Sequence, residues 1–562
     1  MTSGIIITPG LTDRALSSNA MRDRVGEAYL VRVRAVAAIA GVMLAFSLVA
    51  AQLVRLAVLG QDEVSVSMSQ PMAIAFARPD IVDRNGQLLA SDLIMPSLFA
   101  DPALVVDKDE LAEKLGRVLP NLDQAELRKS LLDRDKRFVW IRRGTSTRQA
   151  EAIHNLGLPG IEFRNELKRA YPGGTLAGHV LGYVDIDNKG IAGIERFLDD
   201  NGQVDPVHTP NLSNRPPVQL SLDIGVQHAV EEELTAAMAT YKARAAVGLV
   251  MDARSGEILA AASLPGVDPL IPSLERETMD RLAGGTYELG SIFKMFTVAM
   301  AMDSGKFRLD SAVDVRKPLR VGGFTITDSH PVGRVLSVAE VFRRSSNVGA
   351  GMLALDLGAE RQKEFFQRVG LIGSMKTEAG SVSDVQLPER WEAVETVTRS
   401  YGHGIAVTPL QFAAAAASLV NGGKRVTPTY LRRPTGSEGD GERVISEETS
   451  MKFNALMRSN VTEAHGTGRR ADVPGLEVGG KTGTAELPGK GGYQEKSVIS
   501  SFFASFPMSN PKYVTLVSLF EPQPIKETSM QITAGRNAAP VTAKIIARIA
   551  PQLDVMSRPE TP

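Results

Sequence analysis

Residues 286–297 read TYELGSIFKMFT, and the interpretation of the whole chain starts from this stretch. It places Ser291 three residues before Lys294, directly after Gly290 and ahead of an apolar run. On a helix these two side chains share one face, and Ser291 stands in the first turn, where free backbone N–H groups favour negative charge. A serine needs a nearby base to become a nucleophile, and a desolvated lysine beside other positive charge can lose its proton and serve as that base.

Ser-x-x-Lys alone is a weak signal, because a helix-capping serine followed by a solvated lysine gives the same pattern. Two further motifs lie downstream in the same predicted domain. Ser345-Ser346-Asn347 falls between helical stretches, and Lys481-Thr482-Gly483-Thr484 falls in a predicted strand. Each alone is compatible with a polar turn or a glycine-containing exposed strand. The three motifs together, in this order, predict an active site.

The motifs supply the groups that an acyl transfer requires. Ser291 can attack a carbonyl while Lys294 takes its proton, and Ser345 can return a proton to the leaving amine. Lys481 adds positive charge, which keeps Lys294 neutral and attracts an anionic end of the substrate. The predicted catalytic residues are therefore Ser291, Lys294, Ser345 and Lys481.

Four further residues are predicted to bind the substrate. Asn347 can hold an amide backbone, and the hydroxyls of Thr482 and Thr484 can bind a terminal carboxylate. Gly483 lets a substrate backbone lie against the strand as an added β-partner. Backbone N–H groups of Ser291 and Thr484 are expected to form an oxyanion hole, so the predicted reaction passes through a serine ester.

The composition of the chain limits the number of domains, the partners and the kinds of site that are expected. A chain of 562 residues is expected to hold two or more domains, and 43% hydrophobic with 23% charged residues is typical of globular proteins. A net charge of −1 gives no reason to expect a nucleic-acid partner. The absence of cysteine excludes disulfides and thiolate chemistry, and seven histidines without H-E-x-x-H or H-x-H give no support for a metal site. No cofactor is expected.

An uncharged run from Ala35 to Val54 predicts a membrane anchor, since about 20 apolar residues span a bilayer core. A buried core helix is disfavoured because the run lacks a polar face. A cleaved signal peptide is the second alternative, suggested by Val49-Ala50-Ala51, but the apolar run and the preceding segment are longer than usual. The arginines before the run place the N-terminus in the cytoplasm and the chain after residue 55 outside it.

The pattern of elements predicts five segments. They are a cytoplasmic tail (1–34), a transmembrane anchor (35–55), a non-catalytic pedestal or dimerisation-type domain (56–218), a catalytic domain (219–552) and a C-terminal tail (553–562). The pedestal contains many turn-forming residues, such as Asn85-Gly86. It contains no group of residues that predicts a catalytic or binding site. The catalytic domain has strands at both ends and helices between, which predicts an α+β fold with an antiparallel sheet, a helical lobe and a site in the cleft between them.

The three motifs resemble those of class B penicillin-binding proteins. Within this class the chain is most similar to the septal, division-specific FtsI type, on the basis of His330-Pro331, a compact catalytic domain and a short C-terminal tail. The resemblance implies a β-lactamase-like transpeptidase domain after the pedestal and covers residues 35 to about 550. It also rests on Arg78–Gly86, Arg169–Pro172, Gly182-Tyr183, Gly193–Glu195, Asp223, Gln227, Glu288–Ser291, Ser345–Gly349, Tyr401–Gly404, Thr408–Gln411 and Lys481–Ala485.

This resemblance implies a peptidoglycan D,D-transpeptidase of the inner membrane, with its catalytic domain in the periplasm. The donor is the D-Ala-D-Ala end of a stem peptide, the acceptor is an amine on a neighbouring stem, and β-lactams acylate the serine. An FtsW-type glycan polymerase and other division proteins are the implied partners. The alternatives are an elongation-specific class B enzyme, a D,D-carboxypeptidase or β-lactamase, and a non-enzymatic β-lactam-sensing or scaffolding membrane protein. Both lysines being intact argues against a scaffold.

The sequence departs from the family pattern in two places. Leu289 and Ile292 stand where the family usually has proline and threonine, so the rigidity of the loop before the nucleophile is expected to differ. The segment 197–206 is shorter than the corresponding segment of the family, which affects the contacts expected between the pedestal and its partners. His330 and His403 are expected to be structural, because each lies in a Gly/Pro turn and the mechanism needs neither.

Overall fold

The computed structural model describes residues 33–34, 36–52, 78–133, 135–204, 216–271, 278–434, 441–489 and 492–557. The chain divides into two compact units, Met1–Ala73 and Ile74–Pro562, and each is described by itself.

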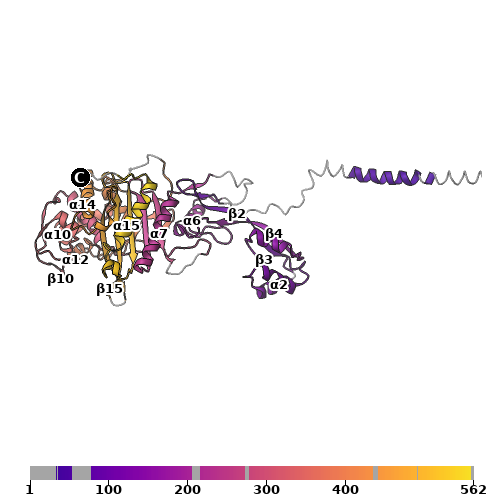
Figure 1. Cartoon of the computed structure of the whole chain (residues 1–562), viewed down its shortest axis with the longest axis horizontal. Helices are drawn as coiled ribbons and strands as arrows, with labels where there is room; N and C mark the ends of the chain where they lie inside the picture. Colours follow the sequence, from indigo (N-terminus) through magenta and orange to yellow (C-terminus); the bar gives the residue numbers. More distant parts are fainter. Residues whose placement is uncertain are drawn as a thin grey trace, which may run out of the picture. The chain divides into compact units, whose positions relative to one another are not determined.

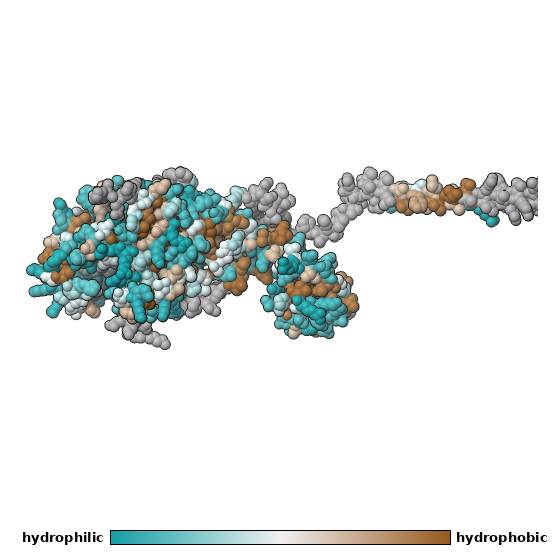
Figure 2. Space-filling model, viewed as in Figure 1, coloured by the Kyte–Doolittle hydropathy of each residue, from teal (hydrophilic) through white to brown (hydrophobic). Residues whose placement is uncertain are grey.

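In the first unit, residues 36–52 form a helix whose side chains are exposed. Its surface is largely hydrophobic (Figure 2), with Ile39, Leu44 and Phe46 more than half exposed. Residue 35 and residues 53–55, at the two ends of the predicted anchor, lie outside the described residues. None of the helices that the structure describes has both the length and the apolar character that a membrane crossing requires.

The second unit begins with a five-stranded sheet in the order β3-β2-β1-β5, in which β4 also pairs with β2. The predicted Asn85-Gly86 turn is confirmed, since it joins β1 to the antiparallel β2 and Gly86 has φ +82°. The elements are β1 (Ile81–Val82), β2 (Leu88–Ala100), α2 (Lys108–Val118), α3 (Gln124–Ser130), β3 (Val139–Arg142), α4 (Thr147–His154), β4 (Ile161–Ala170), α5 (Gly178–Leu181), α6 (Gly193–Asp200) and β5 (Val218–Gln219).

A buried ion network holds this first part together. The Glu195 carboxylate, on α6, accepts from Arg78 Nε at 2.7 Å and from Arg169 Nε at 2.6 Å, and all three side chains are inaccessible to solvent. Arg78 also pairs with Asp199, and Arg169 with Asp92. The stretches around Arg78, Arg169 and Glu195, which resemble those of the family, thus meet in one buried ion network. The sequence alone did not predict this contact.

The catalytic part is built on a second five-stranded sheet in the order β14-β15-β16-β6-β7, with antiparallel pairing throughout. The strands predicted at both ends of the catalytic domain are confirmed. Their bounds are β6 (Ala245–Asp252), β7 (Ile258–Leu264), β14 (Gly479–Gly489), β15 (Gly492–Phe506) and β16 (Tyr513–Phe520).

Helices cover both faces of this sheet. Helices α7 (Ile224–Tyr241) and α15 (Ala538–Ile549) pack side by side on one face (Figure 1), where their apolar side chains meet those of β15 and β16. The other face meets the helical lobe, whose core includes Phe293, Phe296 and Phe412. The predicted α+β fold, an antiparallel sheet with a helical lobe, is confirmed.

The lobe contains most of the remaining elements. Its helices are η3 (Gly290–Phe293), α8 (Lys294–Asp303), α9 (Val338–Arg344), α10 (Asn347–Leu357), α11 (Ala359–Arg368), α12 (Ala393–Arg399), α13 (Pro409–Val420) and α14 (Glu447–Thr462), with η4 (Arg469–Ala471) after them. Its short strands are β8 (Ala312–Asp314), β9 (Leu319–Val321), β10 (Phe324–Ile326), β11 (Val335–Ser337), β12 (Lys376–Thr377) and β13 (Gly380–Ser381).

Two helical stretches carry residues of the candidate site. Residues 338–357 form two helices, and the second motif lies at the break between them, as predicted, with Ser345 at φ +58°. The stretch with Ser291 begins as a 3-10 turn, η3, and becomes α-helical only at Lys294. In both places a regular α-helix begins or ends next to a residue of the candidate site.

Candidate active site

A cleft of about 980 Å³ brings the three sequence motifs together. Its floor is formed by the start of η3 and the break between α9 and α10, and one wall is the edge strand β14. Lining residues include Ser291, Asp328, Arg344, Ser345, Asn347, Arg469, Arg470, Thr482, Thr484, Glu486 and Arg536.

Lys294 is the centre of the polar contacts in the cleft. Its side chain is fully buried, and its Nζ lies 3.0 Å from Ser291 Oγ, 3.1 Å from Ser345 Oγ, 2.5 Å from the Ser345 carbonyl oxygen and 2.7 Å from Asn347 Oδ1. One amine therefore contacts the predicted nucleophile and two residues of the second motif.

The third motif contributes a second buried lysine. Lys481 Nζ donates to Ser345 Oγ at 3.1 Å and to the Thr482 carbonyl oxygen at 3.0 Å, so the Ser345 hydroxyl lies between two lysine amines. The structure thus places Ser291, Lys294, Ser345 and Lys481 in one continuous chain of polar contacts.

Burial controls the ionisation of both lysines. Desolvation holds the pKa of Lys294 well below its ordinary value, and the positive charge of Lys481 lowers it further, while Asp328 opposes both effects. Desolvation also lowers the pKa of Lys481, to about 7. An uncharged Lys294 can accept a proton from Ser291 at neutral pH.

Ser345 adopts a left-handed conformation that few non-glycine residues adopt. It is the C-cap of α9, and the next residue, Ser346, is the N-cap of α10 through a 2.9 Å bond from Gly349 N to Ser346 Oγ. The turn between two capped helices aims the Ser345 hydroxyl and the Asn347 amide at the same amine.

The sequence motifs did not identify Asp328 as a residue of the site. Its Oδ2 accepts from Ser346 Oγ at 2.7 Å and its Oδ1 accepts from Val348 N at 3.0 Å, so it clamps the start of α10 from a separate loop. The sequence signal for Asp328 is its position two residues before His330-Pro331, in the same turn.

The structure gives a packing reason for a glycine at position 483, in addition to the predicted one. A Cβ there would lie 2.4 Å from the Leu289 carbonyl oxygen and 2.9 Å from Ile292 Cγ2. The missing side chain therefore lets η3 pack against β14. Leu289 and Ile292, the two departures from the family pattern, are buried at this contact.

Thr482 and Thr484 both line the cleft, and Thr484 Oγ1 also accepts from Ala534 N at 3.1 Å. His330 and His403 line it as well. His403 Nδ1 lies 3.3 Å from Glu288 Oε2, and Glu288 Oε1 accepts from Gly404 N at 2.8 Å. These contacts tie the 402–404 turn to the segment before Ser291, which fits the structural role predicted for His403.

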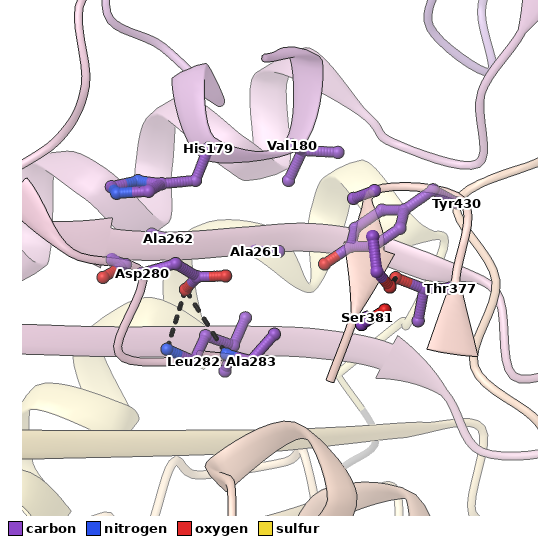
Figure 3. A pocket seen from close by; sticks show the side chains of 13 residues that line it. His179, Val180, Ala261, Ala262, Asp280, Leu282, Ala283, Thr377, Ser381 and Tyr430 are labelled. Carbon is purple, nitrogen blue, oxygen red and sulfur yellow. Dashed lines mark hydrogen bonds between the residues drawn. The ribbon is translucent and has the colours of Figure 1, made fainter. Parts of the chain in front are cut away.

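A much smaller cavity, of about 40 Å³, lies between α5 and the outer side of strand β7. Figure 3 shows His179 and Val180 on one side of it, and Asp280, whose carboxylate accepts from the N–H groups of Leu282 and Ala283. It contains none of the predicted site residues and has room for little more than one water molecule. Within the described ranges no cluster of three or more His, Asp or Glu side chains could hold a metal ion.

Comparisons with known proteins agree with this architecture. Residues 246–547 match the model of the penicillin-binding protein transpeptidase domain, and residues 73–201 match that of the penicillin-binding protein dimerisation domain. The transpeptidase domain of penicillin-binding protein 3 from Burkholderia pseudomallei superimposes with a TM-score of 0.54 at 29% identity, over 61% of this chain and 98% of that one. The predicted transpeptidase-like fold is thereby confirmed.

Two relatives of similar length are named as peptidoglycan D,D-transpeptidases. The probable peptidoglycan D,D-transpeptidase FtsI of Caulobacter vibrioides is 40% identical over 493 residues, covering 86% of this chain and 82% of the relative. The peptidoglycan D,D-transpeptidase FtsI of Escherichia coli is 28% identical over 512 residues, covering 86% and 84%. The chain therefore belongs to the penicillin-binding protein transpeptidases, as an enzyme of class B and of the FtsI type.

Proposed function

We propose that this chain, a peptidoglycan D,D-transpeptidase, works through an ester on Ser291 with Lys294 as the base. The observation that supports the assignment most strongly is the 3.0 Å contact between Ser291 Oγ and the buried Lys294 Nζ. The two shortest contacts of that amine, to the Ser345 carbonyl and to Asn347 Oδ1, can take the two N–H groups of a neutral amine. Its lone pair is then left for the Ser291 hydroxyl proton.

Acylation follows from this geometry. Ser291 Oγ attacks the carbonyl of the penultimate D-Ala of the donor stem peptide as Lys294 removes the proton. Backbone N–H groups of Ser291 and Thr484 stabilise the developing oxyanion. Ser345, placed between Lys294 and Lys481, delivers a proton to the departing amine of the terminal D-Ala. The peptide bond breaks, the Ser291 ester forms, and D-Ala leaves.

Substrate binding uses the edge of β14. Thr482 and Thr484 bind the donor's terminal carboxylate, and Asn347 holds its amide backbone. At Gly483 only the backbone is available to pair with the donor, because its side-chain direction is occupied by Leu289 and Ile292. A β-lactam carries a carboxylate and a reactive amide in similar relation, and it acylates the same serine.

The acyl-enzyme provides the direct test. We expect full-length protein incubated with labelled penicillin to carry one stable adduct on the peptide that contains Ser291, and Ser291→Ala to carry none. An undiminished adduct on Ser291→Ala would exclude the assignment.

The proposal also assigns each segment of the chain a place relative to the inner membrane. Residues 1–34 form the cytoplasmic tail, 35–55 the single-pass inner-membrane anchor, 56–218 the pedestal, 219–552 the periplasmic transpeptidase domain and 553–562 the tail. The uncharged run from Ala35 to Val54 and the exposed apolar side chains of residues 36–52 support the anchor.

The enzyme acts at the division septum beside an FtsW-type glycan polymerase and other division proteins. The FtsI names of its relatives support this role over cell elongation. Depletion of the protein is expected to give filamentous, undivided cells, whereas rounded cells would assign it to elongation.

A further inference from the structure

The strand β14 carries a third polar side chain on the face that it turns to the cleft. Successive side chains of a strand alternate between its two faces, so Thr482, Thr484 and Glu486 share one face, and all three line the cleft. The proposed mechanism uses the two threonines and leaves Glu486 without a role. Glu486 is also the last residue of β14 before its pairing with β15 shifts register. A carboxylate thus stands in the active site, and its function has to be explained.

Packing contacts along β14 place the nucleophile relative to Glu486. A Cβ on Gly290, the residue before Ser291, would lie 2.7 Å from the Thr484 carbonyl oxygen and 3.3 Å from Ala485 Cβ. The turn that carries the nucleophile therefore meets the strand at residues 484 and 485. Glu486 is the next residue of the strand, so its side chain enters the cleft directly beyond this contact.

The direction of the bound donor brings its acyl side to Glu486. In the proposed complex the terminal carboxylate lies at Thr482 and Thr484, and the scissile carbonyl lies at Ser291. The acyl side, which becomes the ester on Ser291, therefore extends past Thr484 toward Glu486. A strand advances by about 3.3 Å per residue, so Glu486 follows Thr484 by about 7 Å. Its carboxylate is within reach of substituents on the acyl side, close to the reacting carbonyl.

The charge of Glu486 is available to such a substituent. Two acids line the described cleft, Asp328 and Glu486, and Asp328 already accepts hydrogen bonds at the start of α10. Among the side chains that the structure describes, none forms a hydrogen bond or ion pair with the Glu486 carboxylate, whereas Arg536 in the same cleft donates to Gln531 at 2.9 Å. Glu486 is half-buried, so salt screens its charge less than that of an exposed carboxylate.

We propose that Glu486 is a specificity-determining residue that selects acyl groups by charge, in favour of a cationic substituent and against an anionic one. The inference rests on the proposed transpeptidase mechanism and names a class of acyl donor, one with an ammonium group on the acyl side of the reacting carbonyl. Such an ammonium group forms a charge-assisted hydrogen bond with the Glu486 carboxylate. A carboxylate in the same place meets a like charge, which slows acylation.

The test compares three penicillins that differ at one carbon of the acyl side chain. Ampicillin carries an ammonium group there, carbenicillin carries a carboxylate, and penicillin G carries neither. The second-order rate constant for acylation of Ser291 is measured with full-length protein in detergent, in slightly acidic buffer that keeps the ampicillin amine protonated. We expect Glu486→Gln to lower the ratio of the ampicillin constant to the carbenicillin constant by about 10-fold, because attraction and repulsion are lost together. Glu486→Arg should lower this ratio further.

The change in this ratio carries the conclusion, because arginines also line the cleft and act on the wild-type value. Glu360→Gln, which alters an exposed carboxylate on α11 outside the cleft, is the matched control and should keep the wild-type ratio. A ratio that Glu486→Gln leaves unchanged would overturn the proposal. Penicillin G reports separately on the mechanism, so the absence of its adduct on Ser291 of the wild type would mark failure of the proposed function instead.

Discussion

At the scale of single residues, the site depends on how burial and neighbouring charges set the ionisation of Lys294. The three motifs predicted which side chains meet, because each motif carries its own chemistry. The sequence could not reveal Asp328, since its role depends on a loop folding against the start of α10. It also could not reveal why residue 483 is glycine, because the obstructing Leu289 carbonyl is distant in sequence.

Asp328 allows a prediction about pH. Its negative charge raises the pKa of Lys294, so Asp328→Asn should lower that pKa further. Because the neutral base exists above its pKa, the acidic limb of the penicillin acylation rate should move to lower pH. The charged groups around Lys294 in the cleft are Asp328, Lys481 and Arg344, with His330 and His403 as further titratable groups. A variant that acylates more slowly at every pH without moving the limb would assign Asp328 a purely structural role.

Gly483 allows a prediction about packing. Gly483→Ala places a methyl group against the Leu289 carbonyl, which must move the turn that carries Ser291. We expect a loss of roughly 1–3 kcal/mol in unfolding free energy and at least a 10-fold slower acylation. Gly266→Ala is the control, since its Cβ would meet nothing nearer than 3.9 Å. Unchanged acylation in Gly483→Ala would show that the contact is not required.

At the scale of elements, hydrophobic periodicity predicted helices and strands well where apolar faces were continuous. Examples are the strands at both ends of the catalytic domain. At residues 338–357 the predicted position of the second motif, between two helical stretches, is confirmed, but periodicity alone does not identify Ser345 and Ser346 as the caps at that break. Short polar caps carry little periodic signal, although here they position the second motif.

The ion network on α6 gives an element-scale prediction. Glu195→Gln removes the negative charge that two buried arginines share. We expect about 3–5 kcal/mol less unfolding free energy, because uncompensated buried charge remains. Glu113→Gln, whose ion pair with Arg117 on α2 is exposed, is the matched control and should change stability by under about 1 kcal/mol. Equal losses in both variants, measured by denaturant unfolding, would show that the network adds no stability.

At the scale of the whole molecule, composition and motif order predicted a multi-domain α+β enzyme, and the structure and the family matches agree. Less accessible from sequence was how the pedestal meets the catalytic part. Asp83, in the β1–β2 turn, is fully buried and accepts from Asn85 N, Gln87 N and Ile224 N. A turn motif thus also fixes the start of α7, a contact that no local pattern contains.

This junction yields a whole-molecule prediction. Asp83→Ala leaves three backbone N–H groups without their acceptor, so we expect at least about 3 kcal/mol lower stability. We also expect faster proteolysis between the two parts. Asp80→Ala, an exposed neighbour in the same segment, is the control. Proteolysis at the same rate in both variants would show that the turn does not hold the parts together.

The central claim is that Lys294 is an uncharged base at neutral pH. Its most direct test is the second-order rate constant of penicillin acylation of the wild-type protein as a function of pH. We predict an acidic limb far below the ordinary lysine pKa of about 10.4, with Lys294→Arg essentially inactive throughout. A rate that keeps rising up to pH 10, or a Lys294→Arg variant with the wild-type profile, would contradict the account.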